Sequence, residues 1–524
     1  MRLSRWLAPY LLGALVAGGA MFLVRSPGYM DADYYFATAR QLSAGHGFSE
    51  PFLWNYLDDP EGLPHPSHLY WPPLTSLVAA LPMTLTSSNF RLAQVPFFLM
   101  AVCLPAVSVA LARLFGSDTG RLWLAGCLAA FSGFFLPYLV TTDSFSLYAL
   151  LGTATLWSLA ATARSPHLWR WLGCGALVGL CHLTRADGLV FLVPGVFAIW
   201  MSGRQRGAGM MALLLGYALA MSPWWARNLA ATGSVVAPGT SRALWLLNYD
   251  ELFAYPASLL TPGRWWDSGL AAILTARARA LGTNLQSLVG VNGLVFLGPL
   301  MAIGAWRNRA DPLVRLTAVY LLLLLGVMTV IFPFAGARGG FFHSSAAVMP
   351  ILWALVIPGL EAVSAWGARR RGWLAGQAFT VLGIGAVVLA AGLTAGLTWR
   401  RTVGDSRSPV WQASQRAYQA VAEAMLPRAT AEQVVAVNNP AGFHLASGCR
   451  AIVIPDGGSE VLRAVVERYA ADWVVLEPNH PLGLDSLYAD PGSLSWLQVA
   501  GEIRPEGVPV FLLRVDRRAL DGSP

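Results

Sequence analysis

Lysine is missing from this sequence of 524 residues, so all 36 basic residues are arginine. Any phosphate that the chain binds must therefore be held by arginine, histidine or backbone N–H groups. Cysteine is also scarce: there are five, four of them lie within apolar runs, and none has the spacing of a zinc-binding pair. The sequence predicts neither a disulfide framework nor a zinc site.

Charged residues are few as well. Only 12% of the residues are charged, whereas 55% are hydrophobic, and the mean hydropathy is +0.52. One soluble core cannot bury so much apolar surface, so the chain requires lipid as its solvent. The net charge of +8 is compatible with nucleic-acid binding, but the arginines gather in short loops between apolar runs. Membrane topology accounts for the charge better, and no nucleic-acid partner is expected.

Apolar runs predict eleven transmembrane helices. A bilayer core of about 30 Å needs roughly 20 apolar residues per helix. The predicted spans are 6–24, 93–115, 122–139, 144–163, 170–184, 188–202, 209–225, 283–305, 314–333, 344–366 and 374–398. The first resembles a signal peptide, but the spans that follow favour a retained anchor. The shorter stretch 71–85 is predicted to be an interfacial helix on the outer face.

Arginines in alternate loops set the predicted orientation, because basic loops stay in the cytoplasm. They lie before the first span and in every second loop after it: Arg2, Arg5, Arg113, Arg121, Arg164, Arg170, Arg204, Arg206, Arg307, Arg309, Arg315, Arg369, Arg370 and Arg371. The N-terminus is therefore predicted to be cytoplasmic and the C-terminal tail extracytoplasmic. The predicted location is the cytoplasmic (inner) membrane.

The apolar runs stop near residue 400. The predicted division is a transmembrane domain at 1–400, with outer-face loops at 25–92 and 227–282, and an extracytoplasmic α/β domain at 401–524. Segments 434–438, 451–455, 473–478 and 508–515 are predicted strands, and 460–469 a helix. The predicted fold class is an α-helical polytopic membrane protein with a small C-terminal α/β domain. That domain has no phosphate-binding glycine fingerprint, which favours a scaffold or acceptor-docking role.

Polar residues concentrate at the predicted outer ends of the spans. They are Asp31, Asp33, Asp143, Arg185, Asp187, Arg227, Arg338 and His343. Charged groups at the ends of apolar helices are costly in lipid, so their convergence predicts a functional site. The chemistry that they suit is glycosyl transfer from a lipid phosphate. A carboxylate would act as base on an acceptor hydroxyl, while arginines neutralise the departing phosphate.

Asp31 is the predicted catalytic base, because it directly follows the first span and would lie at the membrane surface. Asp33 is the second candidate. The alternative is that either carboxylate only caps the helix that runs to Ser43.

Arg185, Arg227, Arg338 and His343 are predicted to bind the donor phosphate. Two glycines between Arg338 and His343 would let the backbone approach a ligand closely. Arg185 could instead pair with Asp187, and Arg227 could be an interfacial anchor.

Asp143, Asp187, Tyr70 and Trp71 are the predicted substrate contacts. Asp143 could instead cap the following helix, and most outer-loop aromatics should form an interfacial belt. His65 and His68 could bind a metal, but no second cluster supports this and a loop role is favoured. No cofactor is predicted with certainty, and a divalent cation is the one left open.

These motifs together resemble the GT-C superfamily of integral membrane glycosyltransferases, in particular the protein O-mannosyltransferase and aminoarabinose-transferase-like group (glycosyltransferase family 39-like). The resemblance covers about residues 1–350. It rests on the acidic first outer loop Asp31–Tyr35, Tyr70-Trp71-Pro72-Pro73-Leu74, Asp143, Thr184-Arg185-Ala186-Asp187-Gly188 and Pro223-Trp224-Trp225-Ala226-Arg227-Asn228.

The resemblance implies a polyprenyl-phosphate sugar donor, an inverting displacement and a base carried by the first-loop aspartate. The sequence departs from aminoarabinose transferases at two places. Asp31-Ala32 stands where they carry Asp-Glu, and Trp71 stands where they carry a lysine. Arg185, Arg227 or Arg338 would then supply the charge for the donor phosphate.

Two other function classes stay open. A lipid or polysaccharide transporter or flippase should line a midplane path and show repeated halves, whereas this sequence shows no repeat and its charges gather at one face. A non-catalytic assembly protein would use a GT-C-like core to present the C-terminal domain. The expected partners are a polyprenyl-phosphate sugar donor, membrane lipids and an acceptor that is a lipid, a glycan or a protein.

Overall fold

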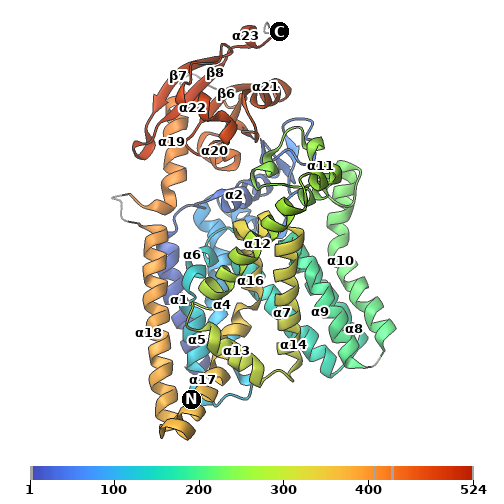
Figure 1. Ribbon diagram of the computed structural model, residues 1–524, viewed down its shortest axis with the longest axis vertical. Helices are drawn as coiled ribbons and strands as arrows, with labels where there is room; N and C mark the ends of the chain where they lie inside the picture. Colours follow the sequence, from blue (N-terminus) through green and yellow to red (C-terminus); the bar gives the residue numbers. More distant parts are fainter. Residues whose placement is uncertain (1–3, 204, 405–407, 426–429, 522–524) are drawn as a thin grey trace.

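The computed structural model describes residues 4–203, 205–404, 408–425 and 430–521. Long helices run side by side in one bundle, and a smaller unit that contains a sheet sits on one end of it (Figure 1). Helix α1 (Ser4–Leu23) begins toward the opposite end of the bundle from this unit. Arg2 and Arg204, two of the arginines in the predicted topology, lie outside the described residues.

Six described helices are long and apolar enough to cross a membrane, or seven if the bent pair Thr119–Ala130 and Gly133–Leu139 is one span. The predicted multi-pass helical fold is confirmed, while the count of eleven stays a prediction. The bundle contains α1 (Ser4–Leu23), α4 (Phe90–Leu114), α5 (Trp123–Ala130), α6 (Leu136–Leu139), α7 (Phe145–Arg164), α8 (Leu168–Thr184), α9 (Leu192–Ser202), α10 (Arg206–Thr232), α13 (Gly298–Arg307), α14 (Pro312–Gly326), α15 (Pro333–Ala335), α16 (Phe341–Ser345), α17 (Met349–Arg371) and α18 (Ala375–Thr402).

The prediction of one continuous helix over 283–305 is wrong. Helix α12 (Leu270–Gln286) continues through a π-helical segment, Ser287–Asn292, and the chain then breaks before α13. Leu294 and Val295 at the break have φ of 43° and 61°, a conformation that side chains of this size rarely adopt. The buried Asn292 Nδ2 donates to Ser345 Oγ over 2.9 Å. Hydropathy registers the apolar run but not this tertiary contact.

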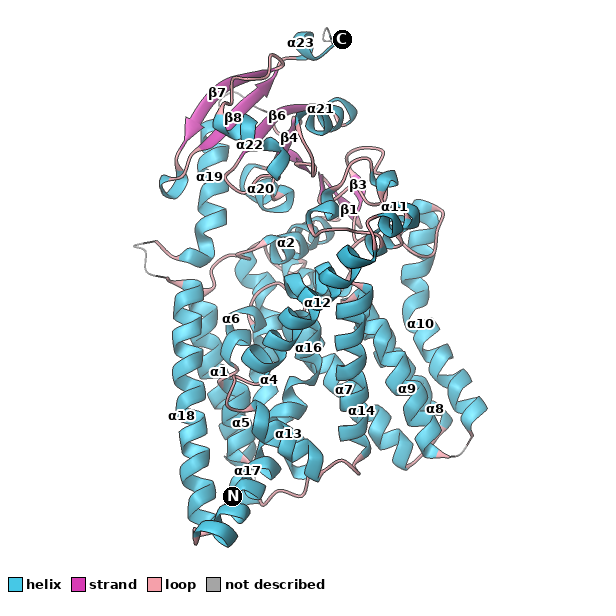
Figure 2. Cartoon of the chain, in the orientation of Figure 1, coloured by secondary structure: helices cyan, strands magenta, loops and turns pink. Residues whose placement is uncertain are grey.

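Helix α2 (Met30–Ser43) lies between the bundle and the smaller unit (Figure 2). Asp31 and Asp33 occupy its first turn, where carboxylates complement the partial positive charge of a helix N-terminus. Its residues 32–39 are all buried, because one face packs on the bundle and the other on the C-terminal unit. The short apolar stretch after Pro72 and Pro73 forms α3 (Leu74–Met83), and its interfacial position stays a prediction.

The C-terminal unit is an α/β layer structure, as predicted. It contains α19 (Ala413–Met425), β4 (Val434–Val437), α20 (Pro440–Ser447), β5 (Arg450–Val453), α21 (Ser459–Arg468), β6 (Ala471–Leu476), α22 (Asp485–Ala489), β7 (Leu497–Ile503), β8 (Val510–Val515) and α23 (Arg517–Asp521). The strand order is β2-β5-β4-β6-β8-β7, where β2 is the short segment Phe52–Leu53. Strand β7 was not predicted, because it is a partly exposed edge strand whose side chains show no regular apolar alternation.

The sheet is not built from residues 401–524 alone. Strand β2 (Phe52–Leu53), from the first outer loop, pairs in parallel with β5. In the same loop, β1 (Ser49–Glu50) pairs antiparallel with β3 (His65–Pro66). Tyr56 donates its hydroxyl hydrogen to the carbonyl of Val453, and Tyr469 donates to the carbonyl of Pro60 over 2.9 Å. The first outer loop and the predicted C-terminal domain therefore share one sheet and one core.

Candidate functional site

Three residues that were predicted at the outer face converge between α2 and the bundle. Asp31 lies in the first turn of α2, Asp143 directly precedes α7, and His343 lies in α16. One ligand atom from each lies within 4.8 Å of the other two. His343 Nε2 is 3.0 Å from Asp143 Oδ2 and 3.7 Å from Asp31 Oδ2. We call these residues the triad.

Asp143 is the buried anchor of the triad. It is buried, and it accepts hydrogen bonds from the Tyr29 hydroxyl at 2.5 Å and from the Ser144 backbone N–H at 2.5 Å. Burial alone would raise the pKa of Asp143, but the nearby His343 and these hydrogen bonds outweigh it and lower the pKa to about 2. Asp143 is therefore a permanent anion at neutral pH.

His343 is oriented by the backbone of the segment before it. Its Nδ1 lies 2.9 Å from the carbonyl oxygen of Gly339, and Gly339 has a φ of 128°, which favours glycine. An Nδ1–H group that donates to a carbonyl leaves Nε2 to face the carboxylate of Asp143. Without a metal, a doubly protonated imidazole donates to both acceptors, the Gly339 carbonyl and the Asp143 carboxylate.

The triad also has the donor set of a divalent-cation site. Two carboxylates and one imidazole point at a common region, and a histidine ligand commonly donates its other N–H to a backbone carbonyl, as His343 does to Gly339. A bound cation would take Nε2 as a ligand and would polarise a phosphate oxygen. Among the described residues no other group of His, Cys, Asp and Glu comes together in this way.

Asp31 is the more accessible carboxylate of the triad. Its side chain is 31% exposed, whereas that of Asp143 is 1% exposed. Burial raises the pKa of Asp31 to about 6; His343 and Arg185 pull it down, and Asp143 pushes it up. A carboxylate with a pKa just below neutrality that can reach solvent is suited to proton abstraction.

Arg185 brings a fixed positive charge to the triad. It lies between α8 and a short 3₁₀ turn, Ala186–Phe191, and its Nε is 3.1 Å from Asp187 Oδ1 and 3.0 Å from Ser344 Oγ. A terminal nitrogen lies 3.4 Å from Ser144 Oγ. Arg185 therefore pairs with Asp187 and also lies at the site, because Ser144 and Ser344 are the chain neighbours of Asp143 and His343.

Arg338 lies in the helical turn Gly336–Gly340 that precedes α16, and Tyr70 lies before α3. The Arg338 guanidinium lies 5.0 Å from the centre of the Tyr249 ring. Burial raises the pKa of Tyr70, and the nearby Tyr249 and Asp31 add to that shift.

Three predicted site residues lie elsewhere. Asp33 faces away from Asp31 and accepts a hydrogen bond of 2.8 Å from Asn439 Nδ2, since positions two apart on a helix point in different directions. Trp71 packs against Trp54, with ring centroids 3.9 Å apart. Arg227 lies 4.7 Å from the centre of the Trp224 ring and donates to the carbonyl of Phe48. The structure does not bring these three into the triad.

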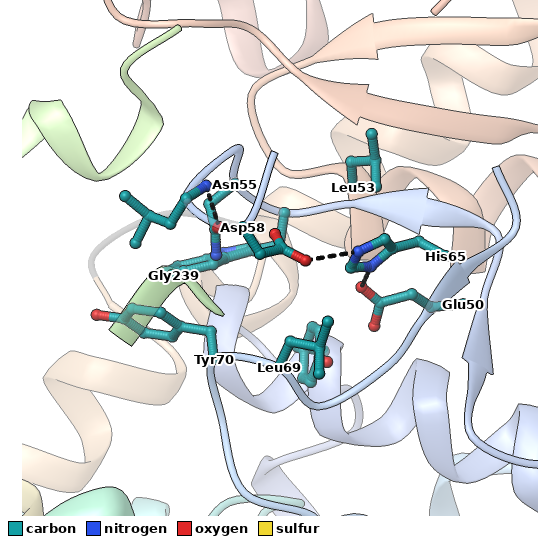
Figure 3. Close-up of a pocket in the computed structure, with 11 residues that line it drawn as sticks. Glu50, Leu53, Asn55, Asp58, His65, Leu69, Tyr70 and Gly239 are labelled. Carbon is teal, nitrogen blue, oxygen red and sulfur yellow. Dashed lines mark hydrogen bonds and ion pairs between the residues drawn. The ribbon is translucent and has the colours of Figure 1, made fainter. Parts of the chain in front are cut away.

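His65 and His68 do not form a metal-binding pair. His65 Nε2 is 2.8 Å from Asp58 and its Nδ1 is 3.4 Å from Glu50, so both ring nitrogens are already engaged (Figure 3). Burial would lower the pKa of His65, but the hydrogen bonds that its ring donates to Asp58 and Glu50 outweigh burial and raise the pKa to about 9. The favoured loop role fits this arrangement: a charged imidazole closes the first outer loop.

Tyr29, Ser144 and Ser344 are site residues that the sequence did not reveal. Tyr29 lies just before Asp31 and Ser144 directly after Asp143, so their positions beside predicted residues were the available signal. Nothing in the sequence indicates that the Tyr29 hydroxyl reaches Asp143.

Comparisons with known proteins agree with this architecture. Residues 70–226 match the model of the dolichyl-phosphate-mannose-protein mannosyltransferase family. A crystal structure of ArnT from Cupriavidus metallidurans bound to undecaprenyl phosphate is similar, with a TM-score of 0.54, 13% identity, and coverage of 96% of this chain and 97% of ArnT. The crystal structure of the same ArnT in the apo state is similar too, with a TM-score of 0.53, 13% identity, and coverage of 98% of this chain and 98% of ArnT. No curated protein sequence matches the chain.

The structure is therefore that of a multi-pass membrane protein, and its fold is similar to that of ArnT. The chain has the ArnT-like GT-C fold, and the predicted resemblance to the GT-C superfamily is confirmed. The family model that matches residues 70–226 describes mannosyltransferases.

Proposed function

We propose that this protein transfers a sugar from a polyprenyl-phosphate-linked donor to an acceptor at the outer face of the cytoplasmic membrane. The observation that carries the proposal is the convergence of Asp31, Asp143 and His343 within 4.8 Å, with Arg185 alongside. These groups come from outer-face segments far apart in sequence. A lipid-phosphate donor is consistent with the undecaprenyl phosphate in the ArnT crystal structure.

In the proposed reaction, Asp31 takes the proton from an acceptor hydroxyl while that oxygen bonds to the anomeric carbon of the sugar. The bond from this carbon to the phosphate oxygen breaks at the same time, and polyprenyl phosphate leaves. A single displacement inverts the anomeric configuration. Asp143 and His343 influence the pKa of Asp31, and His343 lies within 4 Å of both carboxylates.

Arginines neutralise the phosphate charge in this proposal, since the chain has no lysine. Arg185 is fixed by Asp187 and Ser344, so it costs little reorganisation during the reaction. Arg338, from the segment before His343, would approach the phosphate from the loop side. Arg227 is engaged with Trp224 and Phe48, and we assign it a supporting role in the outer loop.

The orientation belongs to the same proposal. The predicted cytoplasmic loops and the N-terminus lie at the end of the bundle opposite the C-terminal unit (Figure 1). With the N-terminus in the cytoplasm, the triad and the C-terminal unit are extracytoplasmic. The acceptor hydroxyl then belongs to a lipid, a glycan or a protein on that side.

The reaction class is tested with purified protein in nanodiscs. Polyprenyl-phosphate sugars and nucleotide sugars are supplied separately, with a membrane extract as acceptor, and with or without added divalent cation. We expect incorporation only from lipid-linked donors, and inverted anomeric configuration in the product by NMR. Movement of lipid across proteoliposomes without any incorporation would favour a transporter instead. A matched control is Asp267→Asn, because Asp267 is exposed on the outer helix α11 (Pro262–Asp267) and should not affect transfer.

A further inference from the structure

A second polar cavity lies on the other side of α2 from the triad. It lies between the segment after α1, the side of α2 that carries Asp33 and Arg40, and helices α19 and α20 of the C-terminal unit. Arg25, Ser26, Asp33 and Arg40 line it, and Ser414 and Gly442 close it from the C-terminal side. The mechanism proposed above uses none of these residues.

The cavity contains buried polar groups with unused bonding capacity. Ser26 is 1% exposed, and its hydroxyl oxygen has no hydrogen-bond partner among the described residues. Asp33 is 7% exposed and accepts from Asn439 Nδ2. A Cβ on Gly442 would lie 2.9 Å from Asp33 Oδ2, so the glycine lets α20 approach this carboxylate. Buried polar groups normally have partners, and a ligand in the cavity would provide them here.

Two arginines give the cavity a net positive charge. Both Arg25 and Arg40 are exposed. The Arg25 guanidinium donates to the carbonyl of Phe22 and lies 4.8 Å from the Phe22 ring centre. In the part of the chain that the structure describes, the Arg40 guanidinium forms no hydrogen bond or ion pair. Opposite them stands one carboxylate, Asp33, so an anion is the complementary ligand.

The position of the cavity selects a lipid as the source of that anion. Arg25 follows the end of α1, and the neighbouring helix α4 begins at Phe90, which also lines the cavity. Arg91 donates to the carbonyls of Met21 and Val24 at this same level. The cavity thus opens where two spans leave the membrane, the depth of lipid headgroups. Phe22, just below, is 64% exposed and would contact acyl chains.

We propose that this cavity binds the headgroup of an anionic phosphoglyceride from the outer leaflet, with Arg25 and Arg40 on the phosphate and with Ser26 and Asp33 on the hydroxyl groups of the headgroup. The lipid joins α2 and the C-terminal unit to the membrane surface. Phosphatidylglycerol has the required chemistry, because it carries one negative charge and two headgroup hydroxyls. This inference does not depend on the proposed transfer reaction.

The test is native mass spectrometry of the full-length protein, released from nanodiscs of phosphatidylglycerol and phosphatidylcholine. We expect phosphatidylglycerol to be retained preferentially, and retention to fall at least tenfold in the Arg25→Gln, Arg40→Gln double variant. Both side chains are on the surface, so the fold should survive, and each single variant provides a milder second measurement. The matched control is the double variant Arg450→Gln, Arg504→Gln, which removes two exposed arginines of the C-terminal unit.

Three results would overturn the proposal. One is equal retention of phosphatidylglycerol by the wild type and the Arg25→Gln, Arg40→Gln variant. Another is equal retention of phosphatidylglycerol and phosphatidylcholine by the wild type. The third is displacement of the lipid by millimolar inorganic phosphate, which would identify a free-phosphate site. Hydrogen exchange adds an independent readout: phosphatidylglycerol should protect the amides of residues 24–29 and 413–418 in the wild type only.

Discussion

The hydroxyl of Tyr29 donates a hydrogen bond of 2.5 Å to Asp143, although 114 residues separate the two in the chain. Tyr29 is itself held by Trp411, whose ring meets it edge-on at 5.8 Å and whose Nε1 donates to the carbonyl of Ser26 over 2.9 Å. The segment that leads into the C-terminal unit therefore supports the triad through Tyr29. This contact makes Tyr29 a positioning residue for Asp143.

Removing the Tyr29 hydroxyl should slow transfer without unfolding the protein. In Tyr29→Phe the ring still packs against Trp411, but Asp143 loses one hydrogen-bond donor. We expect kcat to fall ~10- to 100-fold, the usual effect of losing a residue that orients a catalytic group, with little change in KM. The control is Tyr10→Phe, because Tyr10 is 41% exposed on α1. Equal activity of Tyr29→Phe and the wild type would show that this hydrogen bond has no role in catalysis.

The pH dependence of transfer should identify the base. Asp31 must be ionised to accept a proton, and burial raises its pKa to about 6. Activity should therefore be high at neutral pH and be lost as the pH falls through about 6. Burial also raises the pKa of Asp33, so the variants separate the two candidates: loss of transfer in Asp33→Asn but not in Asp31→Asn would assign the base to Asp33 instead.

Arg185 and Arg227 should differ in their effect on transfer. Arg185 is tied to the triad through Ser144 and Ser344, so Arg185→Gln should lower kcat/KM by ~100-fold or more. Arg185→Lys keeps the charge but loses the planar guanidinium, and it should recover only part of the activity. Arg227→Gln should lower kcat/KM by less than ~10-fold, since Arg227 packs on Trp224 and Phe48.

Thermal unfolding serves as the control for these arginine variants. Loss of Arg185 leaves Asp187 without its ion-pair partner, which destabilises the protein as well. The assays are therefore run well below each variant's unfolding temperature. Losses of kcat/KM that are the same for Arg185→Gln and Arg227→Gln would contradict the placement of Arg185 beside the donor phosphate.

His65 should stabilise the first outer loop. In His65→Leu, Glu50 and Asp58 would remain as buried carboxylates without the imidazole between them (Figure 3), and we expect a loss of about 3 kcal/mol at pH 6. The pKa of His65 is about 9 in the folded state and about 6.5 in the unfolded state. Protonation of the imidazole therefore favours the folded state. Its contribution is complete below about pH 6.5 and is lost as the pH rises through about 9.

Unfolding temperatures of the wild type and His65→Leu across this range provide the measurement. The difference between them should be largest near pH 6 and small near pH 10. A difference that is independent of pH would show that the imidazole acts only through packing. Hydrogen exchange in residues 49–66 should increase in the variant at pH 6.

The sequence predicted the helical bundle and the Asp31 end of the site for physical reasons. Apolar runs require lipid, and arginines in alternate loops place Asp31, Asp143 and His343 at one membrane face, so their proximity follows once the helices pack. Helical periodicity also indicates that the side chains of Asp31 and Asp33 point in different directions. The prediction that named both residues as candidates for the base did not use this periodicity.

Contacts between distant short segments escaped prediction. Strand β2 has two residues, Phe52 and Leu53, and it joins the sheet only because β5 offers a free edge. No local pattern marks so short a strand. The break at Leu294 and Val295 likewise depends on the partners of Asn292, which lie in a different helix. Such features come from tertiary contacts rather than from propensity.

The most direct test of the central claim compares transfer from a polyprenyl-phosphate sugar by wild type, Asp31→Asn and Asp267→Asn in nanodiscs under single-turnover conditions. Asp31→Asn keeps the size of the side chain and removes the base. We predict that Asp267→Asn matches the wild type, whereas Asp31→Asn is folded, binds the donor and transfers at least ~1,000-fold more slowly. Transfer by Asp31→Asn at the wild-type rate would contradict the assignment of Asp31 as the base and the site built around it.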